Sequence, residues 1–166
     1  MKAMEYIVRT REYLDYLEEH ILNVQRAWNE IQEKCKDMAF ISDDFTFFTL
    51  DKEIKDHDLS KFSEEEFVQY RKAFYPINKA PKGVLDSAWE HHKNNNPHHW
   101  ENWTQKTGVA DIIWIPNCVH MIVDWLAMSY KFGDSPKEYY ESNTDTIKIP
   151  DFAIKFMYQI FERLEK

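Results

Sequence analysis

Apolar residues recur at helical spacing along most of the chain, with charged residues between them. From about Met4 to Cys35 they lie on one face of a helix, at Ile7, Leu14, Leu17, Ile21, Val24, Trp28 and Ile31. This spacing, kept over many turns, predicts one long amphipathic helix with these residues buried. His20 precedes Val24 by one turn, at the edge of the apolar stripe, so its imidazole can point inward.

A second and a third helix follow, each with its own start signal. Ser42, Asp43 and Asp44 supply N-cap and first-turn groups, and the apolar face of the helix after them continues through Ile54 to His57. The run Ser63-Glu64-Glu65-Glu66 has the pattern of a capping box. It predicts the start of a third helix there, which buries Phe67, Tyr70 and Phe74.

The second half of the chain predicts four more helices and no strand. One helix carries Trp89 and His92 on its inward face and ends at Asn96-Pro97, because proline cannot continue it. The next runs from Pro116 to a stop at Gly133 and carries Asp124. Ser135-Pro136 opens a short helix, and Pro150 opens a last one that buries Phe152, Phe156, Met157, Ile160 and Leu164.

Composition agrees with one helical domain. The chain has 166 residues, of which 43% are hydrophobic and 16% aromatic, enough for a single buried core. Only 3 glycines and 6 prolines are present, which leaves little material for the turns of an all-β fold. We therefore expect an all-α, single-domain bundle of about six to seven helices over residues 1–166.

Charge and cysteine content narrow the classes of partner. The formal net charge is -8 and no Lys or Arg stripe follows the chain, so binding to long nucleic acid is not expected. A small anionic substrate is still compatible with this negative net charge, because a bound divalent ion can supply local positive charge. The two cysteines form no Cys-x-x-Cys pair, and the N-terminus has no continuous apolar segment. We expect a cytoplasmic protein outside the membrane; no pattern indicates its oligomeric state.

Histidines and aspartates supply the candidate chemistry. His57-Asp58 sits just before a break in the helical pattern, and four imidazoles lie between His91 and His99. The candidate metal ligands are His20, His57, Asp58, His92, His98, His99 and Asp124. Imidazole and carboxylate ligands without cysteine suit one or two divalent ions, such as Mn, Zn, Fe, Co or Mg, in a hydrolytic or redox centre. Asp58 can bridge two ions while His57 binds one.

Each candidate ligand also has an ordinary structural explanation. His20 can be a half-buried surface residue, His57 can interact with the last carbonyls of its helix, and Asp124 can pair with His120. Which of His91, His92, His98 and His99 bind an ion stays open. The metal site is favoured because candidates fall independently on inward faces of different predicted helices, where ionisable groups need a partner.

Two residues are candidates for a direct part in catalysis. Asp58 can hold the metal and orient a water, and Lys61, three residues later, can hold a phosphate oxygen. Lys61 can equally be a solvated loop lysine or pair with one of Glu64 to Glu66.

These residues also carry a family resemblance. The order His20, His57-Asp58, Asp124 resembles the His…His-Asp…Asp pattern of the HD-domain superfamily of metal-dependent phosphohydrolases, and residues 57–61 resemble its His-Asp-x-Gly-Lys segment, with Ser60 at the glycine position. The segments HDLSKFS, NPHHW and DWLAMS more closely resemble an uncharacterised family of small bacterial and phage proteins. The superfamily resemblance implies an all-helical fold, and His92 with His98 or His99 resembles the added ligands of its two-metal members.

The resemblance implies hydrolysis of a phosphoester bond in a nucleotide or another small phosphorylated compound. One alternative is a di-iron oxygenase on the same scaffold, which bound iron with visible absorption would favour. Another is a non-catalytic metal-containing protein that binds or inhibits a partner, which tight ligand binding without turnover would favour.

Overall fold

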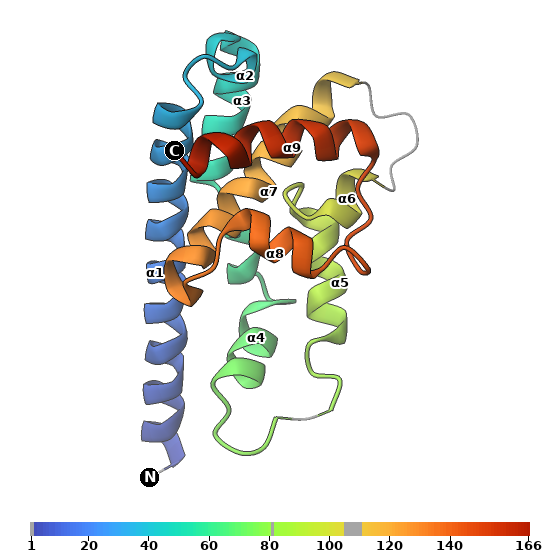
Figure 1. Ribbon diagram of the computed structural model, residues 1–166. Coiled ribbons are helices and arrows are strands. Elements are labelled where there is room, and N and C mark those ends of the chain that lie inside the picture. Colours follow the sequence, from blue (N-terminus) through green and yellow to red (C-terminus); the bar gives the residue numbers. More distant parts are fainter. Residues whose placement is uncertain (1, 81, 105–110) are drawn as a thin grey trace.

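The computed structural model describes residues 2–80, 82–104 and 111–166, and this part of the chain is helical without a strand (Figure 1). Its elements are α1 (Lys2–Lys34), α2 (Ala39–Ser42), α3 (Asp44–Lys55), the 3-10 helix η1 (Leu59–Phe62), α4 (Phe67–Phe74), α5 (Asp86–Asn95), α6 (Trp100–Thr104), α7 (Asp111–Phe132), α8 (Pro136–Ser142) and α9 (Asp151–Leu164). The predicted all-α class is confirmed. The described residues form more helices than predicted because α2 and α6, with 4 and 5 residues, are too short for a periodic pattern.

The central element of the bundle is α7. It packs against α1, α3, α6, α8 and α9, and the consecutive residues Cys118 and Val119, then Met121, Ile122 and Val123, are all buried. A helix that is apolar on every side has to be surrounded by other elements. The composition of this segment therefore accounts for its central position.

Two apolar clusters hold the helices together. The larger joins α1, α3, α7 and α9, and a smaller one joins Tyr13 and Leu17 of α1 to Tyr70 of α4 and Ala88 of α5. On α1, His20 lies between Leu17 of the small cluster and Val24 of the large one. The position predicted to point inward is thus buried at the boundary between the two clusters.

Some residues predicted to be buried are exposed. Ile7 and Leu14 are 43% and 41% exposed, because the N-terminal part of α1 extends past the main body and packs on one side only, where α4 and the segment after it lie (Figure 1). In the same region of α1, Tyr13 is the buried residue instead, at 1%. Phe74 and Phe152 are 56% and 53% exposed, each on a short or terminal stretch of helix with solvent on one side.

Two predicted helix starts also differ from the structure. The helix α4 begins at Phe67, and residues 63–66 form a turn before it, so Ser63 to Glu66 is not a capping box. Glu66 is turned inward and is fully buried. Pro116 lies inside α7, which begins at Asp111. Within the described residues, no helix has both the length and the apolar character needed to cross a lipid bilayer.

Truncation of Ile31 to alanine should lower the free energy of unfolding by about 2–5 kcal/mol, because it leaves a cavity in the large cluster. Ile31 is completely buried, whereas Ile7, on the same helix, is 43% exposed. The matched variant Ile7→Ala should change stability by less than about 0.5 kcal/mol. Urea denaturation measures both, and equal losses would contradict this account of how α1 packs.

Candidate metal centre

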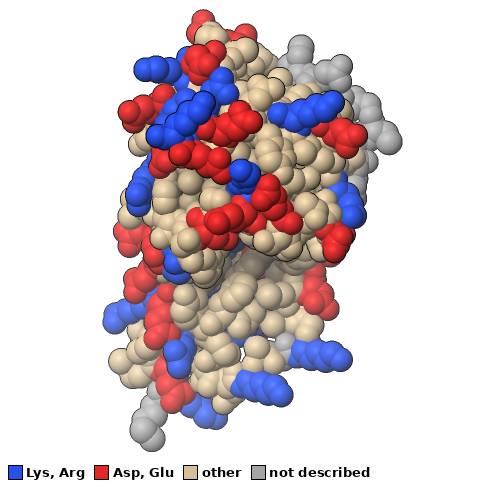
Figure 2. Space-filling view, viewed as in Figure 1, with Lys and Arg blue, Asp and Glu red and all other residues tan. Residues whose placement is uncertain are grey.

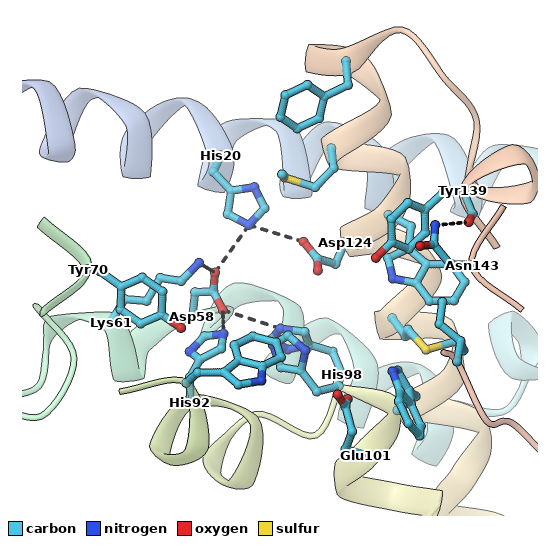
Figure 3. Close-up of a pocket in the computed structure, with 18 of the residues that line it drawn as sticks. His20, Asp58, Lys61, Tyr70, His92, His98, Glu101, Asp124, Tyr139 and Asn143 are labelled. Carbon is cyan, nitrogen blue, oxygen red and sulfur yellow. Dashed lines mark hydrogen bonds and ion pairs between the residues drawn. The ribbon is translucent and has the colours of Figure 1, made fainter. Parts of the chain in front are cut away.

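Side chains from three helices and two turns meet at one buried place (Figure 3). His20 comes from α1, His92 from α5 and Asp124 from α7, while His57 with Asp58 precedes η1 and His98 with His99 lies between α5 and α6. All seven predicted ligands are therefore near one another. Five of them, His20, His57, Asp58, His92 and His98, are 5% exposed or less.

Asp58 is at the middle of this cluster and has an unusual backbone. Its φ is 58°, the only positive φ at a residue other than glycine in the described part of the chain. Aspartate tolerates this left-handed region better than most residues, but the conformation still costs on the order of 1–3 kcal/mol. The turn directs two consecutive side chains, His57 and Asp58, into the protein interior, at 4% and 2% exposure.

A first set of ligand atoms surrounds the Oδ2 atom of Asp58. His20 Nε2 lies 3.4 Å from Asp58 Oδ2, 3.3 Å from Asp124 Oδ1 and 3.0 Å from His57 Nε2. His57 Nε2 lies 3.3 Å from Asp58 Oδ2 and 3.7 Å from Asp124 Oδ1. Ligands about 2.1 Å from a shared ion are about 3.0 Å apart at a right angle and about 3.4 Å apart at the tetrahedral angle. The observed spacings suit one ion.

A second set surrounds the other carboxylate oxygen. Asp58 Oδ1 lies 3.3 Å from His92 Nε2 and 3.5 Å from His98 Nε2, and it accepts no hydrogen bond from the described residues. His92, His98 and His99 each bring one ring nitrogen within 4.8 Å of the others. The Nε2 atom of His99 is buried and likewise lacks a hydrogen-bond partner among the described residues.

The orientation of His92 is compatible with a cation between its Nε2 atom and Asp58. His92 Nδ1 lies 2.8 Å from Oε2 of the buried Glu66, and since a carboxylate only accepts, this nitrogen carries a proton. In the neutral ring, Nε2 then presents a lone pair to Asp58 Oδ1 at 3.3 Å. Two acceptors at this distance repel each other unless positive charge lies between them. A metal-bound histidine typically shows this arrangement, with its other nitrogen held by a carboxylate.

Glu66 also holds the neighbouring imidazole. His91 Nδ1 lies 2.7 Å from Glu66 Oε1, so His91 is turned away from Asp58 and toward the same carboxylate. Ser60 and Asn96 complete the support: Asn96 donates to Ser60 Oγ at 2.7 Å, and Ser60 Oγ lies 3.2 Å from His92 Nδ1. Of the four histidines between 91 and 99, His92, His98 and His99 are thus placed as candidate ligands.

The carboxylates and the lysine at the centre are charged. Burial opposes ionisation of Asp58, but His57 and Lys61 hold the pKa of its carboxyl well below the usual value. Burial likewise opposes the charge on Lys61, yet Asp58, whose Oδ2 is 2.5 Å from Nζ, raises the pKa of the lysine. Against the effect of burial, hydrogen bonds from His92 and His91 lower the pKa of Glu66.

The imidazoles differ from one another in charge. Burial lowers the pKa of His98 far below its usual value and that of His99 to about 4, so both rings are neutral near pH 7 and can bind a metal. Burial also disfavours the charged form of His57, but the adjacent Asp58 raises the pKa of that imidazole overall. Without a metal, a proton on His57 offsets part of the negative charge that an ion would otherwise neutralise.

Two residues of the centre were not recognised in the sequence. The sequence suggests His120 only as a partner for Asp124, but its Nε2 lies 2.9 Å from His57 Nδ1, on the side of the ring away from Asp58. Its place one turn before Asp124 was the available signal. The local sequence of Glu66 fits a capping box and so predicts a different role for it. No local pattern indicates that it contacts a residue 26 positions later.

The cluster forms the floor of a cavity of about 430 Å³. Most of its walls are aromatic or apolar, including Tyr16, Tyr70, Trp89, Trp100, Trp125, Met128 and Tyr139. The side chain of Asp124 is 19% exposed, whereas that of Asp58 is 3% exposed. In Figure 2 the surface is hollowed below α8, with mostly uncharged residues around the hollow. A small molecule can therefore reach the cluster from solvent.

A family model, described as a family of unknown function (DUF5662), matches residues 9–165. The chain belongs to this family. Neither a curated protein nor a solved structure matches it. The DUF5662 match covers all the candidate ligands, from His20 to Asp124, together with Glu66 and His120. The resemblance to the HD-domain superfamily stays a prediction.

Replacing Glu66 with glutamine should weaken the binding of one metal ion by about 10- to 100-fold, because His92 loses the carboxylate that orients it. Glu66 contacts His92 and not His20 or His57, so the other ion should be affected less. Titration against a chelating indicator measures both affinities. The control Glu64→Gln removes the same charge from an exposed position. Equal weakening of both sites, or of neither, would contradict this role.

Proposed function

We propose that this protein is a metal-dependent phosphohydrolase that acts on a nucleotide or another small phosphoester, with two divalent ions that Asp58 and the imidazoles around it would hold. One observation carries the proposal. Asp58 directs Oδ2 toward His20 and His57, and Oδ1 toward His92 and His98, at 3.3–3.5 Å in each case. A single carboxylate between two sets of imidazoles can offer one oxygen to each of two metal ions.

Each set has a distinct composition. His20, His57 and Asp124 would hold one ion together with Asp58, and His92, His98 and His99 are available for the other. When bound, such ions supply a water of lowered pKa and positive charge for the phosphate oxygens. The resemblance of His20, His57-Asp58 and Asp124 to the HD-domain pattern supports the same chemistry.

Lys61 is placed to stabilise charge on a phosphate. Its side chain is 12% exposed and lines the cavity, and its ammonium lies 2.5 Å from Asp58 Oδ2. Asp58 keeps the lysine charged, since it raises the pKa of Lys61. A charged donor held in a largely buried site is worth more in the transition state than the same donor in water.

Asp124 is placed to orient a water. It lies at the edge of the first set, 3.3 Å from His20 Nε2, and its side chain is more exposed to the cavity than that of Asp58. A carboxylate in this position can accept a proton from a water and direct its lone pair toward the substrate. Asp58 has the same capacity, but both of its oxygens already face imidazoles.

Elemental analysis of protein purified without a His tag tests the proposal directly. We expect two divalent ions per chain, and release of phosphate in a screen of nucleotides and generic phosphoesters with Mn, Mg, Zn, Co and Fe. Iron with visible absorption and consumption of oxygen would instead select an oxygenase. Tight ligand binding without turnover would select a non-catalytic binding protein.

Asp58→Asn should remove at least one ion and lower turnover at least about 100-fold, because a neutral amide cannot offer a charged oxygen to each site. Asparagine tolerates a left-handed φ, so the fold should persist. Metal content and phosphate release measure the effect. Asp56→Asn, at an exposed position two residues earlier, is the control. Full metal retention by Asp58→Asn would show that Asp58 is not a ligand.

Lys61→Met should lower kcat by about 100-fold while both ions stay bound, because it removes a transition-state donor and no ligand. Lys36→Met, at an exposed lysine far from the cavity, should leave kcat unchanged. Steady-state kinetics with parallel metal analysis separates the two effects. Loss of metal in Lys61→Met would indicate a structural role for the lysine in place of the one proposed.

A further inference from the structure

We infer that the centre is built for a substrate with a single phosphoryl group, joined to an uncharged or cationic ring that donates hydrogen bonds. This inference rests on the proposed function and names its substrate class. Nucleoside monophosphates fit this description, and nucleoside di- and triphosphates do not. The two sides of the cavity carry opposite kinds of unpaired polar group.

On one side, hydrogen-bond donors lack acceptors. The hydroxyl groups of Tyr13 and Tyr70 are buried and have no hydrogen-bond partner among the described residues, and both tyrosines line the cavity. The Lys61 ammonium lies over the Tyr70 ring, 5.7 Å from its centroid. A phenol hydroxyl can donate one hydrogen bond, and phosphate oxygens accept several. These groups suit the phosphoryl end of a substrate.

On the other side, an acceptor lacks a donor. The Oε2 atom of Glu101 is buried without a hydrogen-bond partner among the described residues, and Glu101 lines the same cavity. In Figure 3, Glu101, Tyr139 and Asn143 lie across Asp58 from Lys61 and Tyr70. Trp100, Trp125 and Tyr139 provide aromatic surface in this region of the lining. A flat ring with N–H or O–H groups can stack there and donate to Glu101.

The charges around the cavity limit the substrate to one phosphate. Among the lining residues, Asp58, Asp124, Glu101 and Asp134 carry four negative charges and Lys61 carries one positive charge, so two divalent ions would leave a net charge of plus one around the cavity. A phosphomonoester dianion more than neutralises that charge near pH 7. Further phosphates would share the cavity with Glu101 and Asp134, and Lys61 is the only lysine or arginine among the described lining residues. Their added charge would meet like charge without a counter-ion.

The first test compares adenosine 5′-mono-, di- and triphosphate as substrates of the manganese-loaded full chain. We expect kcat/KM for the monophosphate to exceed that for the other two by at least about 10-fold, since each further phosphate adds charge near two carboxylates. Equal or faster hydrolysis of the di- or triphosphate would overturn the inference and leave the proposed function intact.

The second test removes the charge of one acidic residue of the cavity lining at a time. Glu101→Gln and Asp134→Asn should each raise the kcat/KM ratio of diphosphate to monophosphate by about 3- to 10-fold, because each removes one repulsive charge. Glu162→Gln, which removes an exposed charge on α9 outside the cavity, should leave that ratio unchanged. If all three variants behave alike, the acidic lining does not select the substrate.

Binding provides a readout that does not depend on turnover. Equilibrium dialysis of the manganese-loaded protein should show tighter binding of adenosine monophosphate than of the diphosphate, with metal content measured afterwards because diphosphates chelate divalent ions. If no phosphoester is hydrolysed with any metal, the proposed function fails, and the order of these affinities still decides the inference. Tighter binding of the diphosphate without loss of metal would overturn it.

Discussion

Asp58 imposes the main physical constraint on this structure. A carboxylate that is 2% exposed must have positive charge or hydrogen-bond donors on both oxygens, since an unpaired buried charge is very costly. Lys61 and the first set of imidazoles compensate Oδ2, while Oδ1 faces two imidazole nitrogens without a hydrogen bond. The surrounding arrangement of histidines follows from this one need for compensation.

The helical bundle holds the histidines and aspartates at the boundary between its two apolar clusters. The contact of α1 with α7 brings His20 to Asp124, and the packing of α3 on α7 brings His57 to His120. Because these helices are held by completely buried residues such as Val24 and Ile122, the ligand positions are fixed by the scaffold. The packed helices also hold the strained, left-handed backbone conformation of Asp58 in place.

Residues that are not candidate ligands hold the imidazole rings of the ligands in position. Glu66 accepts a hydrogen bond from Nδ1 of His92, and Nε2 of His120 lies within hydrogen-bond distance of Nδ1 of His57. Such contacts select the ring orientation that presents a lone pair to a metal. The DUF5662 family is described as one of unknown function. The chemistry of this protein therefore follows from the residues of the site and of the cavity above it.

The helical class, the approximate helix positions and the ligand types follow from the sequence alone, because periodicity, capping residues and side-chain chemistry are local properties. The sequence also indicates that His20, His57, His92 and Asp124 face inward. The folded arrangement adds that the two oxygens of Asp58 face different sets of imidazoles, that Glu66 and His120 support these imidazoles, and that Ile7 and Leu14 stay exposed. These facts depend on distances between residues far apart in the chain, and helix packing sets those distances while leaving no periodic trace in the sequence.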